Sequence, residues 1–168
     1  MSNASALDDF SDLVWEEETK FRVHRRAYTD PNIFEAEMDR IFGQTWIFVG
    51  HTSEIPEAGD YKTSYVGRQP VIVCRVDSDT VAVFYNRCMH RGAVVCREQR
   101  GSANYFRCPY HGWLYGHDGH LVGVPMRDGY SDDFDAPEGL VKLPRVSIYH
   151  GLIFASAAPT GASLDEYL

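Results

Sequence analysis

Two short segments that each pair a cysteine with a histidine constrain the fold of this chain more than any other feature. The segments are Cys88-Met89-His90-Arg91-Gly92 and Cys108-Pro109-Tyr110-His111-Gly112-Trp113. Transition metals favour thiolate and imidazole donors, and the two pairs form one ligand set only if both segments meet. Each segment also contains a glycine, which permits a tight backbone. We therefore expect the fold to bring two hairpin tips together around a metal centre.

Two thiolates and two imidazoles make up the ligand set in which cysteines hold one iron of a 2Fe-2S cluster and histidines hold the other. Two ferric ions, two sulfides and two thiolates sum to about zero charge with neutral imidazoles, whereas four thiolates leave about two negative charges. The mixed site therefore accepts an electron more readily. A zinc-stabilised interaction domain without a redox role is the alternative, although zinc fingers usually pair cysteine with cysteine and histidine with histidine.

From Thr45 onward, short runs rich in Val, Ile, Tyr and Phe alternate with turn residues, a pattern typical of antiparallel strands. Turn residues occur at 67–70, 77–79 and 116–119. Many short strands with regular turns predict a mostly β fold, an antiparallel β-sandwich or small barrel. The expected strands are Trp46–Val49, Tyr61–Val66, Val71–Val76, Val81–Tyr85, Asn104–Phe106, Leu121–Val124 and the run Val146–Ala155.

The pattern before Thr45 predicts a helical extension. Asp30 is a capping residue and Pro31 suits the first helical position, while Gly43 supplies a stop. Residues 7–26 are expected to form a solvated, partly helical extension, and residues 1–6 to be unstructured. Apolar side chains at three- and four-residue intervals predict one packed helix face: Ile33, Phe34, Met38, Ile41 and Phe42.

Charge and hydropathy exclude several classes of partner. The chain has 16 Lys plus Arg against 24 Asp plus Glu, a formal net charge of -8. This charge argues against binding to nucleic acid or to anionic lipid. The longest mostly apolar stretch, residues 147–158, is too short to cross a bilayer, and we find no signal peptide. Four cysteines in 168 residues favour a reducing, cytoplasmic compartment.

The two motifs resemble those of the Rieske domain of aromatic-ring-hydroxylating dioxygenase alpha subunits. The resemblance is carried by Cys88-x-His90-Arg91-Gly92 and Cys108-Pro109-x-His111-Gly112-Trp113-x-Tyr115, and extends from about Tyr28 to Ser156. Similarity is greatest to the benzoate- and anthranilate-type branch, which acts on aromatic acids. It implies a Rieske-type fold with three parts: residues 1–44, the tail and helix; residues 45–158, the 2Fe-2S domain; and residues 159–168, a passage toward a catalytic domain.

The resemblance also implies roles for the motif residues. Cys88 and Cys108 are expected on the buried iron, and His90 and His111 on the outer iron. The cluster would receive electrons from a ferredoxin or reductase and pass them to the mononuclear iron of a neighbouring alpha subunit. That Fe(II) site needs two histidines and a carboxylate. We expect it only in a larger catalytic domain beyond these residues, so the chain is expected to be an N-terminal fragment, inactive alone.

Three further expectations follow. Respiratory Rieske proteins carry a disulfide where this chain has Ala93 and Tyr110, so no bridge is expected between the ligand loops. Cys74 and Cys96 are expected to be small core side chains. A free-standing Rieske ferredoxin is the alternative within the class, and it would lack the helix at residues 30–44.

Arginines are concentrated around the two ligand segments, and Glu98 is the one acidic residue among them. We expect this basic collar to steer an acidic electron donor. Its members are Arg87, Arg91, Arg97, Arg100 and Arg107.

Overall fold

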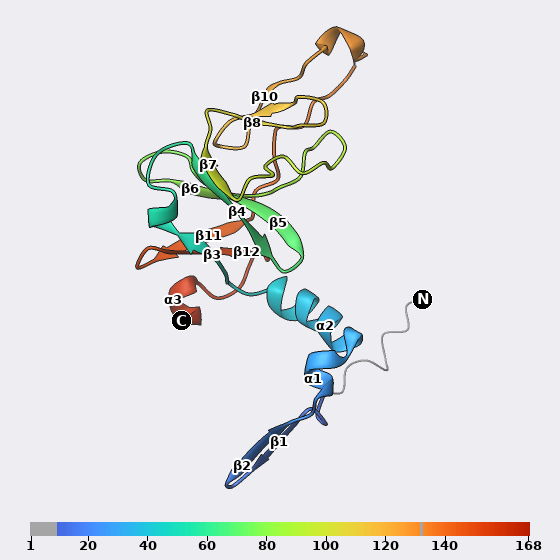
Figure 1. The fold of residues 1–168 in the computed structure, drawn as a ribbon, viewed down its shortest axis with the longest axis vertical. Coiled ribbons are helices and arrows are strands. Elements are labelled where there is room, and N and C mark those ends of the chain that lie inside the picture. Colours follow the sequence, from blue (N-terminus) through green and yellow to red (C-terminus); the bar gives the residue numbers. More distant parts are fainter. Residues whose placement is uncertain (1–9, 132) are drawn as a thin grey trace.

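The computed structural model describes residues 10–131 and 133–168 and has the mostly β, antiparallel fold predicted from the sequence (Figure 1). The expectation for residues 1–6 lies outside the described part of the chain. Three sheets form the body, with strand orders β6-β5-β4-β7, β11-β12-β3 and β10-β9-β8. Their strands are β3 (Ile47–His51), β4 (Asp60–Val66), β5 (Gln69–Arg75), β6 (Val81–Tyr85), β7 (Arg100–Ser102), β8 (Phe106–Arg107), β9 (Leu114–Tyr115), β10 (Leu121–Gly123), β11 (Arg145–Tyr149) and β12 (Leu152–Ser156).

Strand β5 lies between two hydrophobic cores. Successive side chains of a strand point to opposite faces of its sheet. Val71 and Val73 therefore pack with Val49 of β3 and with Ile153 of β12 on one face. The intervening Ile72 and Cys74 pack on the other face, in the core that holds Cys88 and Cys108. The four-stranded sheet thus connects a purely apolar half of the body to the half that carries the two motifs.

Four of the predicted strands agree with the structure to within about two residues at each end, namely those that became β3, β4, β5 and β6. The predicted run Val146–Ala155 was wrong as one strand. It is two strands, because His150 and Gly151 have φ of +47° and +83° and form a two-residue turn between Tyr149 and Leu152. Paired positive φ values match the twist of the flanking strands.

The sequence pattern missed two of the shortest strands and misplaced a third. Strands β7 and β9 have two or three residues each, too few for an alternating pattern to be visible. The predicted strand at residues 104–106 overlaps β8 only at Phe106. The predicted strand at residues 121–124 corresponds to β10. Two of these short strands, β8 and β9, nevertheless flank the second ligand segment.

The predicted helix is present as α2 (Pro31–Glu37) continued by a π-helix, η1 (Met38–Phe42). Asp30 caps it as expected, because its carboxylate accepts a hydrogen bond from the backbone N–H of Asn32 at 3.0 Å. One part of the prediction was wrong: Ile33 is buried, but Phe34 and Ile41 are 46% and 48% exposed. The wider π turn of η1 shifts the angular positions of Met38, Ile41 and Phe42 relative to those of α2, so the five apolar residues do not share one face.

The N-terminal extension contains a β-hairpin, β1 (Val14–Glu17) with β2 (Lys20–Val23), where the sequence predicted a partly helical segment. Cross-strand neighbours such as Trp15 and Arg22 face each other in its register, and aromatic and β-branched residues favour strands. Among the described residues of this extension, only the short α1 (Arg26–Thr29) is helical. In Figure 1 this extension projects from the opposite end of the molecule to β8 and β10.

The remaining helices are short: the 3-10 helices η2 (Thr52–Glu54) and η3 (Arg127–Gly129), and α3 (Leu164–Tyr167). Trp46 holds the chain before α3, because its indole N–H donates to the carbonyl of Ala162 at 3.0 Å. Within residues 10–131 and 133–168, no helix combines the length and the apolar character needed to cross a bilayer.

Candidate metal centre

The two ligand segments form loops with the same backbone closure. In each loop, the backbone N–H of the cysteine donates to the carbonyl of the residue five positions later. The glycine lies four positions after the cysteine, and its N–H donates to the cysteine carbonyl. These four hydrogen bonds measure 2.8 to 3.0 Å. Both glycines have positive φ, +73° and +74°, which side chains with a Cβ rarely adopt. The bonded residues are Cys88, Gly92 and Ala93 in the first loop, and Cys108, Gly112 and Trp113 in the second.

Buried Asn86 holds the first loop against the body. Its amide Nδ2 donates to the carbonyl of Cys96 at 2.7 Å, and its Oδ1 accepts from the N–H groups of Val95 and Cys96 at 3.0 and 2.9 Å. These bonds tie the start of the loop to its end. No sequence pattern singled out Asn86, whose only signal is that a polar residue directly follows the apolar strand β6.

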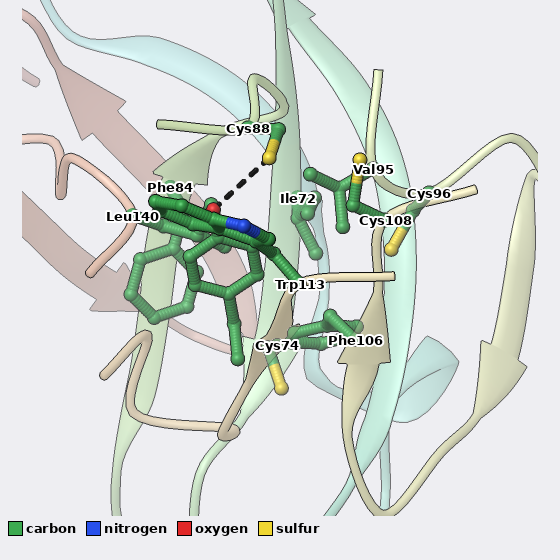
Figure 2. Packing of buried hydrophobic residues seen from close by; sticks show 11 residues of the cluster. Ile72, Cys74, Phe84, Cys88, Val95, Cys96, Phe106, Cys108, Trp113 and Leu140 are labelled. Atoms are coloured by element: carbon green, nitrogen blue, oxygen red, sulfur yellow. Dashed lines mark hydrogen bonds between the residues drawn. The ribbon is translucent and has the colours of Figure 1, made fainter. Parts of the chain in front are cut away.

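The structure brings all four predicted ligands into one region. The side chains of Cys88 and Cys108 are buried in the same hydrophobic cluster, drawn in Figure 2. The imidazole rings of His90 and His111 lie nearer the surface, with their centroids 4.6 Å apart. The thiols therefore occupy the inner side of the site and the imidazoles its outer side.

The buried Nδ1 of His90 has no hydrogen-bond partner, alone among the buried side-chain nitrogen and oxygen atoms of the described residues. Leaving a buried polar atom unpaired is costly, and a metal ion is one partner that satisfies it. Partial burial lowers the pKa of His90, and the neighbouring His111 and Arg91 lower it further. Both effects favour the neutral imidazole, which is the form that binds metal.

Tyr115 places a hydroxyl beside the first thiol. Its ring is fully buried, and its Oη lies 3.1 Å from the Sγ of Cys88, the contact dashed in Figure 2. The backbone N–H of Met89 donates to the same oxygen at 3.1 Å, so the hydroxyl proton is available to the sulfur. Burial raises the pKa of Cys88, and the Tyr115 hydroxyl counteracts this by stabilising the thiolate.

The two histidines lie in different aromatic surroundings. The ring of His90 stacks on the fully buried Trp113, with centroids 4.9 Å apart and planes 8° apart. The exposed ring of His111 stacks on Tyr110, with centroids 3.8 Å apart, and Tyr110 is itself 59% exposed. Trp113 and Tyr115 therefore provide buried aromatic rings on the inner side of the site, whereas Tyr110 covers His111 on the outside.

The other two cysteines, Cys74 and Cys96, are buried in the same hydrophobic cluster as Cys88 and Cys108. All four cysteines are free thiols. Burial raises the pKa of both Cys74 and Cys96 to about 12. The folded state thus favours the protonated thiol. The contribution of this preference to the free energy of unfolding is fully present below the ordinary cysteine pKa near 9, and it is lost as the pH rises toward 12.

We expect Cys74 and Cys96 to resist iodoacetamide in the folded protein at about pH 8, where a thiol of pKa near 12 is only about one part in ten thousand thiolate. In urea at the same pH, both should be alkylated at the rate of free cysteine. Peptide mass spectrometry distinguishes the four positions. Rapid labelling of Cys96 in the folded protein would show that its burial does not suppress its reactivity.

The side chains of the predicted basic collar are exposed, as is Glu98. The side chain of Arg87 lies against Gly92 of the first ligand loop, and that of Arg107 lies against Gly112 of the second. A shallow groove beside the second loop is lined by Arg107, Tyr110, His111 and Pro125. The histidine side of the site is therefore bordered by positive charge.

Among residues 10–131 and 133–168, no group of three or more His, Cys, Asp or Glu side chains is arranged to hold a single metal ion. A two-iron cluster takes two protein donors at each iron. The pair of thiols inside the site and the pair of imidazoles outside it are donors of the types that such a cluster takes.

Comparison with known proteins decides the family. The family model described as the Rieske [2Fe-2S] domain matches residues 45–144, which include both ligand loops. The chain belongs to this family. Rieske domains carry a 2Fe-2S cluster held by two cysteines and two histidines. The residues present fit that cofactor, because the partnerless Nδ1 of His90 and the buried thiols of Cys88 and Cys108 offer donors of the required types.

The relatives of this Rieske domain are larger proteins. The chain is 41% identical over 170 residues to the N,N-dimethyl phenylurea N-demethylase subunit alpha of Sphingobium sp. (strain YBL2), covering 100% of this chain and 37% of that protein. It is 41% identical over 172 residues to the anthranilate 1,2-dioxygenase large subunit of Burkholderia cepacia, covering 98% and 40%. The naphthalene 1,2-dioxygenase from Rhodococcus sp. bound to indole superposes with a TM-score of 0.80 at 41% identity, covering 86% and 33%.

The chain thus spans roughly a third to two fifths of the length of these relatives. It is homologous to the N-terminal Rieske domain of ring-hydroxylating dioxygenase alpha subunits. The match to the N-demethylase subunit covers the whole chain and so includes the helix at residues 30–44, which a free-standing Rieske ferredoxin was expected to lack. Equal identities to the demethylase and to the anthranilate enzyme do not single out the benzoate- and anthranilate-type branch.

Proposed function

We propose that this Rieske domain is the electron-transfer module of a ring-hydroxylating oxygenase. Cys88 and Cys108 would hold one iron of the cluster, and His90 and His111 the other. When bound, the cluster accepts and releases one electron at a time. The observation that carries the assignment is the convergence of both loops, with thiols buried on the inside and imidazole rings 4.6 Å apart on the outside.

The protein side chains set the conditions for that transfer. Trp113 and Tyr115 exclude water from the thiol side, where both are almost fully buried. Tyr115 donates a hydrogen bond toward the sulfur of Cys88. The exposed ring of His111 leaves one edge of the site within reach of another protein. A buried inner side and an open outer side suit transfer of electrons without chemistry on a substrate.

From the relatives, we further propose the electron donor, the electron acceptor and the neighbouring domain of this module. The electron donor would be a ferredoxin or reductase, and the acceptor a mononuclear Fe(II) site in a catalytic domain of a neighbouring alpha subunit. Hydroxylation of an aromatic substrate, carboxylated substrates included, would take place in that domain. Residues 45–158 would form the electron-transfer unit, residues 1–44 its N-terminal extension, and residues 159–168 the passage to the catalytic domain. We place the enzyme in the cytoplasm, without nucleic-acid or membrane partners.

The proposal is tested by the colour and metal content of the purified chain. We expect two irons and two sulfides per chain, visible absorption that bleaches with dithionite, and full recovery of the absorption after reoxidation in air. Recovery over repeated cycles shows that the site carries electrons rather than merely stabilising the fold. A colourless protein with one tightly bound zinc would contradict the proposal.

The basic collar gives a second, quantitative prediction. Reversing two charges, with Arg87→Glu and Arg107→Glu, is expected to slow reduction by an acidic plant-type ferredoxin about tenfold at low salt, because steering depends on opposite charge. Arg22→Glu on the distant hairpin changes the charge in the same direction at one site and should have little effect. Stopped-flow traces at increasing salt provide the check. Rates that ignore both salt and the two reversals would show that the collar does not steer the donor.

A further inference from the structure

The segment after the second ligand loop returns to the core through Tyr130. It contains η3 and follows Met126, whose φ is +56°. The Nε1–H of Trp113 donates to the hydroxyl of Tyr130 at 3.2 Å. Trp113 is 1% exposed, so its indole N–H depends on a protein partner, and Tyr130 provides it.

Trp113 in turn fixes His90. The two rings are nearly parallel, 8° apart, and their centroids are 4.9 Å apart. Both rings turn about their χ1 and χ2 bonds, and stacking ties the plane of the imidazole to the plane of the indole. The bond from Trp113 Nε1 to Tyr130 restricts how far the indole can turn. The plane of the His90 ring, which carries the partnerless Nδ1, therefore depends on Tyr130.

The ring of Tyr130 is itself held by its neighbours. Phe134 packs against it with centroids 4.5 Å apart, and against Trp113 with centroids 6.2 Å apart. The guanidinium of Arg127 lies 4.8 Å from the centroid of the Phe134 ring and donates to the carbonyl of Phe134 at 3.2 Å. Ring packing thus anchors the segment, while the Tyr130 hydroxyl makes its one polar link to Trp113.

We propose that Tyr130 is a positioning residue for His90, acting through Trp113. This inference rests on the proposed function, in which His90 is a ligand of the cluster. The Tyr130 hydroxyl fixes the indole, the indole fixes the imidazole plane, and the imidazole keeps Nδ1 aimed into the site. Tyr130 has no direct role in electron transfer, and a phenylalanine at this position would preserve the packing while removing the link.

The test compares Tyr130→Phe with the unmodified protein in two measurements. The first is the rate at which a chelator removes iron, which we expect to rise about fivefold, the equivalent of one net hydrogen bond. The second is the EPR spectrum of the dithionite-reduced cluster, whose line positions respond to the orientation of a ligand and not to general stability. Tyr65→Phe, at an exposed tyrosine of β4, is the matched control and should change neither.

Two further variants separate positioning from packing. Phe134→Leu weakens the packing but keeps the bond between Tyr130 and Trp113, so the EPR spectrum should stay unchanged even if the chain unfolds more easily. In a Trp113→Phe background, adding Tyr130→Phe should have no further effect on the spectrum, because the indole N–H is already absent.

The outcomes distinguish this inference from the function on which it rests. A normal cluster in the unmodified protein, with an unaltered spectrum and chelator rate in Tyr130→Phe, overturns the positioning role and leaves the electron-transfer module intact. An equal spectral change in Phe134→Leu also overturns it, because packing then explains the effect. Absence of the cluster from the unmodified protein overturns the proposed function, and the inference with it.

Discussion

Replacing Cys108 with alanine is expected to leave a folded but colourless protein with almost no bound iron. Cys108 is 1% exposed, so neither a solvent water molecule nor a side chain at the surface can replace its thiolate as a ligand. An iron with one remaining protein donor is held too weakly to survive purification. Iron and sulfide analysis, visible absorption and circular dichroism of the same sample provide the measurement.

Cys74→Ala is the matched control for this experiment. Cys74 is a fully buried cysteine of the same hydrophobic cluster as Cys108, and the substitution removes the same atom. It should cost about 1 kcal/mol of unfolding free energy through the small cavity, while iron and sulfide remain at two each. Equal cluster loss in the two variants would mean that packing, not ligation, accounts for the effect at Cys108.

Asn86→Ala is expected to lower the free energy of unfolding by about 3 kcal/mol. The substitution leaves three buried backbone groups without partners: the N–H groups of Val95 and Cys96 and the carbonyl of Cys96. Because these groups close the loop that carries Cys88 and His90, the cluster should also be lost faster than from the unmodified protein. Urea unfolding followed by fluorescence and by cluster absorption measures both effects.

The exposed Asn104 offers a comparison for Asn86. Asn104→Ala should change the unfolding free energy by less than about 0.5 kcal/mol, as is usual for surface positions. If Asn86→Ala were equally mild, the hydrogen bonds of Asn86 would not hold the first ligand loop in place.

Much of the fold could be predicted from the sequence where the local pattern is strong. The Asp30-Pro31 pair marks the start of α2, and the strand predicted at residues 81–85 has the bounds of β6. The pattern failed where few residues carry it. The π turn that contains the exposed Ile41 has no periodic signal, and β9 has only two residues. The N-terminal hairpin depends on cross-strand pairing, which charge patterning along the chain does not reveal.

The candidate ligands could be predicted because their chemistry is local. One cysteine and one histidine in each of two Gly-containing loops is a rare combination, and the structure brings all four together. The residues that support them could not be predicted in this way. Asn86 bonds to groups nine and ten residues away, and Tyr130 reaches Trp113 across 17 residues. Such contacts depend on the packing of loops, which composition and periodicity do not determine.

The most direct measurement of the central claim is electron–nuclear double resonance on dithionite-reduced protein that contains ¹⁵N-labelled histidine. If the two loops hold a cluster through two sulfurs and two nitrogens, the spectrum will show two strongly coupled histidine nitrogens. Replacing His111 with cysteine should remove one of the two couplings. A reduced protein with no coupled histidine nitrogen, or one that gives no paramagnetic signal after anaerobic reconstitution with iron and sulfide, would contradict the account.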